Sequence, residues 1–144
     1  MPAMWDNLTL SAAGVIYRAK EEARRFGQSE ADTEHLLLGL LALRTNVACA
    51  IITRLGVDLD VLQGDIETGA ESGEALLPVW KLDFSEAAQM ALALAEQEAG
   101  ENNAGEIGTE HILLGLVREE EGAAGRLLAE HGVTLERVRA EIGK

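Results

Sequence analysis

The chain has 144 residues and a mass of 15.4 kDa, a size that suits one compact domain or two very small ones. Its 12 basic and 25 acidic residues give a formal net charge of -13, which argues against a nucleic-acid partner because phosphate contacts need clustered cations. Apolar residues make up 47% of the chain but aromatic residues only 3%, so the core must be built from aliphatic side chains and alanine. That composition favours closely packed helices.

The sequence also argues against membrane insertion and secretion. Its longest strongly apolar stretch, residues 36–43, is far shorter than the roughly 20 residues needed to span a bilayer. The N-terminus lacks the basic flank and apolar core of a signal peptide. The single cysteine, Cys49, cannot form an intrachain disulfide and is expected to be a buried, inert thiol. We therefore predict a cytoplasmic protein without membrane contact.

An internal repeat emerges when the chain is compared with itself at a shift of 76 residues. Residues 33–40, TEHLLLGL, match residues 109–116, TEHILLGL, at seven of eight positions. The same shift, without a gap, aligns residues from Ala12 with Ala88 to Ile66 with Ile142. We expect a first copy in residues 1–67, a linker at residues 68–81 and a second copy in residues 82–144.

Each copy is predicted to form four helices. In chain order, the first copy is expected to contain a helix capped by Thr9 and ended by Gly27, one that begins near Asp32 or Thr33, one that stops at Gly56, and one capped by Asp58. The second copy repeats this pattern, with Ser85 as its first cap and later helices at residues 112–117, 124–128 and 135–142. No strand is expected. The predicted fold is all-α, with two tandem four-helix repeats related by a pseudo-twofold axis in one compact eight-helix domain.

The linker joins two stretches of different character. Residues 68–75 are rich in Gly, Ser and Glu and suit an exposed segment. The apolar residues 76–80 that follow are expected to dock on a helical surface. Trp5 and Trp80, each just before the first helix of its copy, are expected to cover an edge of the core.

The doubled sequence Thr-Glu-His-Leu/Ile-Leu-Leu-Gly-Leu, which follows a first helix in each copy, resembles the signature of the Clp N-terminal repeat domain. That domain stands at the front of ClpA-, ClpB- and ClpC-type AAA+ unfoldases. The second copy is nearer to the family pattern, because the first has Ala31-Asp32 where Ile-Gly is usual. The resemblance implies a non-enzymatic module that docks protein substrates or adaptor proteins, with the AAA+ Clp unfoldase ring or the Clp protease as further partners and no cofactor.

No Gly-x-x-x-x-Gly-Lys-Ser/Thr run occurs in the sequence, so this chain carries no ATPase module of the P-loop kind. One alternative is a free-standing accessory subunit that stabilises or modulates a Clp protease complex. An enzyme is a weaker third hypothesis, because the sequence contains no nucleophile, nucleotide or metal motif.

Two candidate binding sites combine a helix cap with a glutamate: Thr9 with Glu34, and Ser85 with Glu110. A helix N-terminus offers N–H groups to a phosphate, and a carboxylate can bind a guanidinium. The pairing suits phosphoarginine, and similar positions in ClpC-type N domains of Gram-positive bacteria bind this mark, one site per repeat. Plain helix caps are the simpler alternative.

Two further residues, Thr33 and Thr109, directly precede the two glutamates and belong to the candidate set. Asp32 is expected to add negative charge beside the first site, so phosphoarginine binding is predicted mainly in the second copy. His35 and His111 are expected to be packed residues that hydrogen-bond to the backbone. No metal ligands are predicted, because no histidine or cysteine pair has the spacing of a zinc site.

Overall fold

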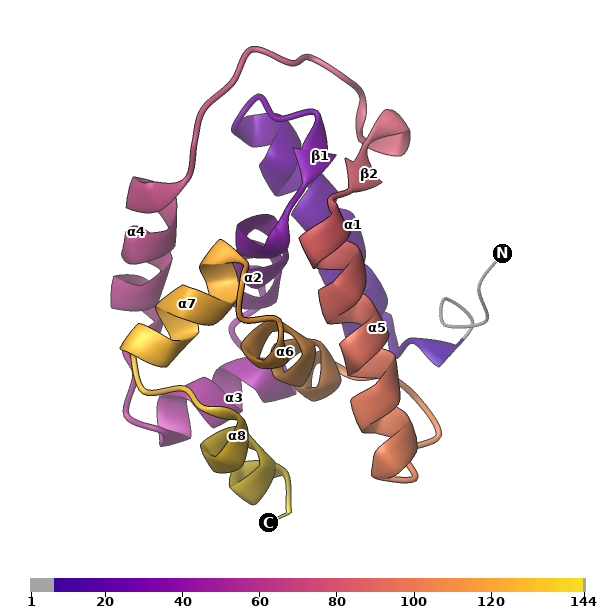
Figure 1. The fold of residues 1–144 in the computed structure, drawn as a ribbon, viewed down its shortest axis with the longest axis vertical. Helices are drawn as coiled ribbons and strands as arrows, with labels where there is room; N and C mark the ends of the chain where they lie inside the picture. Colours follow the sequence, from indigo (N-terminus) through magenta and orange to yellow (C-terminus); the bar gives the residue numbers. More distant parts are fainter. Residues whose placement is uncertain (1–6, 144) are drawn as a thin grey trace.

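The computed structural model describes residues 7–143, and within them the chain forms eight α-helices in two groups of four (Figure 1). The first group is α1 (Leu10–Arg25), α2 (Thr33–Ala42), α3 (Val47–Arg54) and α4 (Leu59–Gly69). The second group is α5 (Glu86–Glu101), α6 (Thr109–Arg118), α7 (Ala123–Glu130) and α8 (Leu135–Ile142). The predicted all-α fold of two four-helix repeats is confirmed.

One continuous core crosses both repeats. α1 packs along α2, α5 packs along α6, and α2 contacts α6 in the middle of the bundle (Figure 1). The largest fully buried side chains are aliphatic and come mostly from α2, α3 and α6. Fully buried alanines such as Ala19 of α1 and Ala95 of α5 let the long outer helices lie close to this centre.

The helix ends lie where the sequence predicts them. The hydroxyl oxygens of Thr9 and Ser85 each accept a bond of 3.1 Å from the backbone N–H three residues on, at the starts of α1 and α5. Asp58 caps α4 in the same way. After α1, Gly27 adopts a φ of 70°, a left-handed conformation that favours glycine and ends the helix.

The two signature histidines complete the starts of α2 and α6. Nδ1 of His35 accepts a bond of 2.9 Å from the backbone N–H of Asp32, and Nδ1 of His111 accepts the equivalent bond of 2.9 Å from Gly108. Each histidine thus occupies the capping-box position that Glu or Gln usually fills. The prediction of packed histidines bonded to the backbone is confirmed.

The buried histidines are expected to make stability depend on pH. Desolvation by burial lowers the pKa of both His35 and His111. Because the unfolded chain then binds protons more readily, stability is fully present above the unfolded pKa of about 6.5 and is lost as the pH falls below it. The double variant His35→Gln, His111→Gln keeps the capping acceptor but removes this titration.

Urea unfolding at about pH 7.5 and about pH 5.5 measures the effect. We expect the midpoint of the parent protein to fall more over this interval than the midpoint of the double variant. Burial raises the pKa of Glu34 above the usual carboxyl value, and because both proteins keep Glu34 the comparison between them isolates the histidines. Equal falls would show that the histidines do not carry this pH dependence.

Short parallel pairings join the two repeats, contrary to the expectation of no strands. β1 (Glu30–Ala31) pairs with β2 (Asp83–Phe84), and Leu8 forms a single bridge with Ile107. Each pairing links the residues just before the first helix of one repeat to those just before the second helix of the other. Segments of one or two residues have no periodicity of their own, so only the association of the repeats creates these strands.

The signature threonines also join the repeats. Oγ1 of Thr33 accepts a bond of 3.3 Å from Ala124 N at the start of α7, and Oγ1 of Thr109 accepts a bond of 3.2 Å from Ala48 N at the start of α3. The cap of α7 is Gly122, which has no side chain for this purpose. Each threonine therefore satisfies a helix end in the opposite repeat.

The linker docks through backbone bonds near the end of α1 and, at its apolar end, through a short turn that contacts α1. Gly73 N and Ala75 N donate bonds of 2.8 Å to the carbonyl oxygens of Phe26 and Gly27. Leu76 is 88% exposed, and Trp80, in the 3-10 turn η2 (Val79–Lys81), is 77% exposed. η2 nevertheless contacts α1, and Val79 is half-buried, so the predicted docking of residues 76–80 on a helix holds in part. The covering role of Trp80 is wrong, and Trp5 lies outside the described residues.

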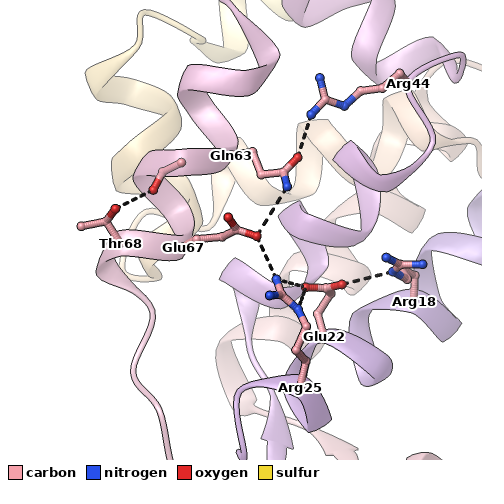
Figure 2. A network of polar contacts seen from close by, with 8 residues as sticks. Arg18, Glu22, Arg25, Arg44, Gln63, Glu67 and Thr68 are labelled. Atoms are coloured by element: carbon pink, nitrogen blue, oxygen red, sulfur yellow. Dashed lines mark hydrogen bonds and ion pairs between the residues drawn. The ribbon is translucent and has the colours of Figure 1, made fainter.

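A polar network ties α1 to α4 (Figure 2). Glu22 of α1 is buried and accepts bonds from Arg18 Nε at 3.1 Å and from Arg25 Nη2 at 2.6 Å. Arg25 also contacts Glu67 of α4 at 2.8 Å, and Gln63 lies beside Glu67 in the same network. Charge-assisted bonds thus fix the orientation of the C-terminal half of α1.

The equivalent residue of the second repeat, Glu98, is held by arginines from other helices. It is 2% exposed and contacts Arg118 Nη1 at 2.8 Å and Arg139 Nη2 at 2.6 Å. Burial alone would raise the pKa of Glu98, but the two arginines outweigh it and the pKa is lowered. The same glutamate position therefore joins α5 to α6 and α8.

Candidate functional site

The N-terminus of α1 lies beside the start of α6. Thr9 is partly buried, and its backbone N–H donates a bond of 3.0 Å to the carbonyl of Ile107. Gly108 and Glu110 follow directly in the chain, at the first turn of α6. The cap of the first repeat thus faces the glutamate region of the second.

The N-terminus of α5 lies in the pseudo-equivalent place, beside the start of α2. Ser85 N donates a bond of 3.0 Å to the carbonyl of Ala31, and Ser85 Oγ donates one of 2.8 Å to Oδ1 of Asp32. Asp32 is therefore next to Ser85, whereas the sequence placed its charge beside Thr9. The Ser85 hydroxyl is already engaged by a carboxylate of the protein.

The caps and glutamates that come together belong to different repeats. Phe26 follows α1, and the centroid of its ring lies 6.0 Å from the centroid of the His35 ring, so α2 begins near the C-terminal end of α1. α1 has 16 residues and is about 24 Å long, which separates Thr9 from Glu34. The expected combinations are thus exchanged: Thr9 lies on the side of Glu110, and Ser85 on the side of Glu34.

The two glutamates have different surroundings. A Cβ on Gly108 would collide with the Glu110 carboxylate, so Glu110 folds back over the glycine at the start of α6. The first repeat has Asp32 at that position, and Oε1 of Glu34 is buried without a hydrogen-bond partner among the described residues. Burial, and then the charges of Asp32 and Glu71, raise the pKa of Glu34.

Thr33 and Thr109 do not face a surface site. They are 0% and 2% exposed, and their hydroxyl oxygens accept the backbone bonds at the starts of α7 and α3. Their inclusion among the binding residues is therefore corrected. The sequence signal that makes them prominent reflects the packing of one repeat on the other.

Residues 7–143 contain no cluster of candidate metal ligands. No group of three or more His, Cys, Asp or Glu side chains is placed there to hold a metal ion. Cys49 is buried, as predicted, and its Sγ lies 3.3 Å from the carbonyl of Leu40. His131 contacts Asp65 at 2.8 Å and so joins the end of α7 to α4.

No single helix in the described part of the chain is long and apolar enough to cross a membrane. α2 and α3 reach that length and apolarity only as a pair, and the chain bends by 94° between them.

The two repeats with their signature helices match a known family. The profile of the Clp repeat (R) N-terminal domain family covers residues 7–76 and 83–144, which include both copies. The chain belongs to this family. The resemblance inferred from the doubled signature is confirmed.

This Clp N-terminal domain has longer relatives. It is 37% identical over 139 residues to the ATP-dependent Clp protease ATP-binding subunit ClpA homolog of Guillardia theta, a match that covers 96% of this chain and 17% of that protein. It is 35% identical over 140 residues to the chloroplastic chaperone protein ClpC of Pisum sativum, covering 97% of this chain and 15% of that protein. The chain therefore spans about a sixth of the length of these relatives.

The fold matches a solved complex as well. The ClpV N-domain in complex with a VipB peptide superposes with a TM-score of 0.79 at 18% identity, covering 95% of this chain and 85% of that one. At this identity the match establishes the shared fold.

Proposed function

We propose that this Clp N-terminal domain binds segments of other proteins, as substrates or adaptors, and delivers them to a Clp-type ATPase ring without catalysing a reaction itself. The observation that carries the proposal is the family match over both repeats. The relatives are named as ATP-binding subunits and chaperones, and this chain corresponds to about a sixth of them, without a P-loop run. An N domain of the same fold, that of ClpV, has been solved with a peptide bound. The predicted cytoplasmic location remains a prediction.

The finer proposal is that the recognised feature is phosphoarginine and that its better site is the one between Thr9 and Glu110. The first turn of α1 contains no acidic residue, so its helix dipole and the N–H groups that Thr9 does not cap are available to a phosphate. Gly108 adds no charge beside it, and Glu110 supplies the carboxylate for the guanidinium. Charge-assisted contacts of this kind contribute roughly 1.5 to 3 kcal/mol each.

The pseudo-equivalent position at Ser85 is less suited to an anion. Asp32 already accepts the Ser85 hydroxyl, and Glu86 places a second carboxylate in the first turn of α5. Glu71 of the linker adds a further negative charge near Glu34. Repulsion between these carboxylates and a phosphate makes this end the weaker one.

Titration calorimetry with a phosphoarginine peptide and its unphosphorylated form tests the proposal. Glu110→Ala is expected to weaken binding of the phosphorylated peptide by about tenfold or more, since about 1.4 kcal/mol is a factor of ten. The matched variant Glu34→Ala is expected to change it much less. Equal affinity for the two peptides, or no effect of Glu110→Ala, would leave Thr9 and Ser85 as structural caps only.

A further inference from the structure

An apolar groove runs along the outside of the first repeat, between α1 and the end of α2, and starts next to the Thr9 cap. Its volume is about 470 Å³. Among the residues that line it are Leu10, Gly14 and Tyr17 of α1, with Gly39, Ala42 and Leu43 at the end of α2. Leu10, Tyr17 and Leu43 are 93%, 58% and 51% exposed. We call this surface the α1–α2 groove.

The floor of the α1–α2 groove is made by small residues. At Gly39 the two helices lie so close that an added Cβ would come within 2.8 Å of the carbonyl oxygen of Val15. At Gly14, in contrast, no atom of the described residues lies within 4 Å of an added Cβ, so the groove is open above it. Leu10, Gly14 and Tyr17 follow a spacing of four and three residues and form one stripe along α1. Such a face is complementary to an apolar helix laid into it.

The second repeat lacks this groove-lining pattern although its helices pack in the same way. The 76-residue shift replaces five of the six groove residues, putting Glu86, Met90, Ala93, Arg118 and Glu119 at the positions of Leu10, Gly14, Tyr17, Ala42 and Leu43. Arg118 at this position is bound to Glu98. The fold therefore does not require an open apolar surface here, and the first repeat presents one as a feature of its own sequence.

Local charge favours an acidic occupant. α1 contains four basic and two acidic residues, whereas the equivalent α5 contains four acidic residues and no basic one. At physiological salt the screening length is about 8 Å, so a segment lying on α1 responds to these charges more than to the net charge of -13 of the whole chain.

Arg18 offers a specific contact at the edge of the groove, where Glu21 also lies. The Arg18 side chain is 50% exposed and is oriented by the bond from its Nε to Glu22. The two terminal nitrogens point away from that bond (Figure 2) and have no hydrogen-bond partner among residues 7–143, so they can pair with a carboxylate on an incoming segment.

We infer that the α1–α2 groove is a second docking surface, which binds an amphipathic helical segment of another protein that carries acidic residues along one edge of its apolar stripe. The inference rests on the proposed function as a docking domain but not on phosphoarginine recognition. The apolar stripe fills the channel above Gly14 between Leu10, Tyr17 and Leu43, and a carboxylate pairs with Arg18. The partner is thus recognised by shape and charge rather than by a phosphate.

Fluorescence anisotropy with labelled synthetic peptides of the length of α1 tests this inference on the whole chain. One peptide carries a leucine stripe flanked by glutamates, a second has lysines in place of the glutamates, and a third is the acidic peptide with a central proline. We expect the acidic helical peptide to bind. The affinities of the lysine and proline peptides are expected to be lower by about tenfold or more.

Gly14→Met gives the first repeat the residue found at the equivalent position of the second. It is expected to lower the affinity for the acidic peptide by about tenfold or more. The matched control is Gly64→Met in α4, which is also exposed, helical and without neighbours around an added Cβ. Gly64→Met should keep the parent affinity. Equal binding of the lysine peptide, an unchanged affinity in Gly14→Met, or an equal loss in Gly64→Met would overturn the inference.

Two further measurements separate the possible occupants and sites. The first is size-exclusion chromatography at several concentrations of the chain. An elution volume that depends on concentration in the parent but not in Gly14→Met would show that a second copy fills the groove, and would overturn the inference. A phosphoarginine peptide is titrated in the same assay. If it binds while the acidic helical peptide does not, the groove inference fails and the proposed function stands. If the acidic peptide binds and the phosphoarginine peptide does not, only phosphoarginine recognition fails.

Discussion

Leu116→Ala is expected to lower the free energy of unfolding by about 2 to 5 kcal/mol. Leu116 is 0% exposed and lies on α6, which contacts helices of both repeats. The substitution removes buried methyl groups and leaves a cavity that the surrounding helices fill only partly. Urea unfolding followed by circular dichroism measures the change. Leu76→Ala, at a linker residue that is 88% exposed, is the matched control and should alter stability little.

A single cooperative transition is also expected for Leu116→Ala, because the reciprocal threonine caps and the paired strands link the repeats. Two separated transitions, or a stability equal to that of the parent, would contradict the assignment of α6 to a core shared by both repeats.

Gly115→Ala is expected to destabilise the protein by about 1 to 3 kcal/mol, although alanine is the better helix former by about 1 kcal/mol. A Cβ at position 115 would collide with the carbonyl oxygen of Ala91, because the backbones of α5 and α6 lie close together there. Backbone atoms cannot move aside as a flexible side chain can, so the two helices must separate and lose packing along their length.

The sign of the effect distinguishes this cause from helix propensity. Gly64→Ala lies in an open part of α4 and should be neutral or raise the free energy of unfolding by up to about 1 kcal/mol. Thermal unfolding of the two variants beside the parent measures both. A stabilised Gly115→Ala would show that α5 and α6 have room at this position.

The parts of the fold that depend on neighbouring residues were predictable from the sequence. Thr9 and Ser85 cap helices because each hydroxyl reaches a backbone N–H three residues away, and such local bonds leave a readable pattern. The packing of His35 and His111 and their bonds to the backbone were likewise predictable, because both residues stand in a repeated leucine-rich helix. The shift of 76 residues located all four helices of each copy.

The parts that depend on how the copies associate were not predictable. The sequence gives no direction for one repeat relative to the other, so Thr9 was grouped with Glu34 although it lies beside the start of α6. Asp32 was assigned to the wrong cap for the same reason. The α1–α2 groove had a possible signal in Leu10, Gly14 and Tyr17, which form an apolar stripe that the second copy lacks.

The most direct test of the docking function joins this chain to a ClpC-type ATPase in place of the ATPase's own N domain. The rate at which the chimera, with its protease, degrades an arginine-phosphorylated client is compared with the rate of the ring that lacks an N domain. The account predicts faster degradation by the chimera and loss of the gain in Glu110→Ala. A chimera no faster than the ring without an N domain, or a chain that stimulates degradation only when added as a separate subunit, would contradict it.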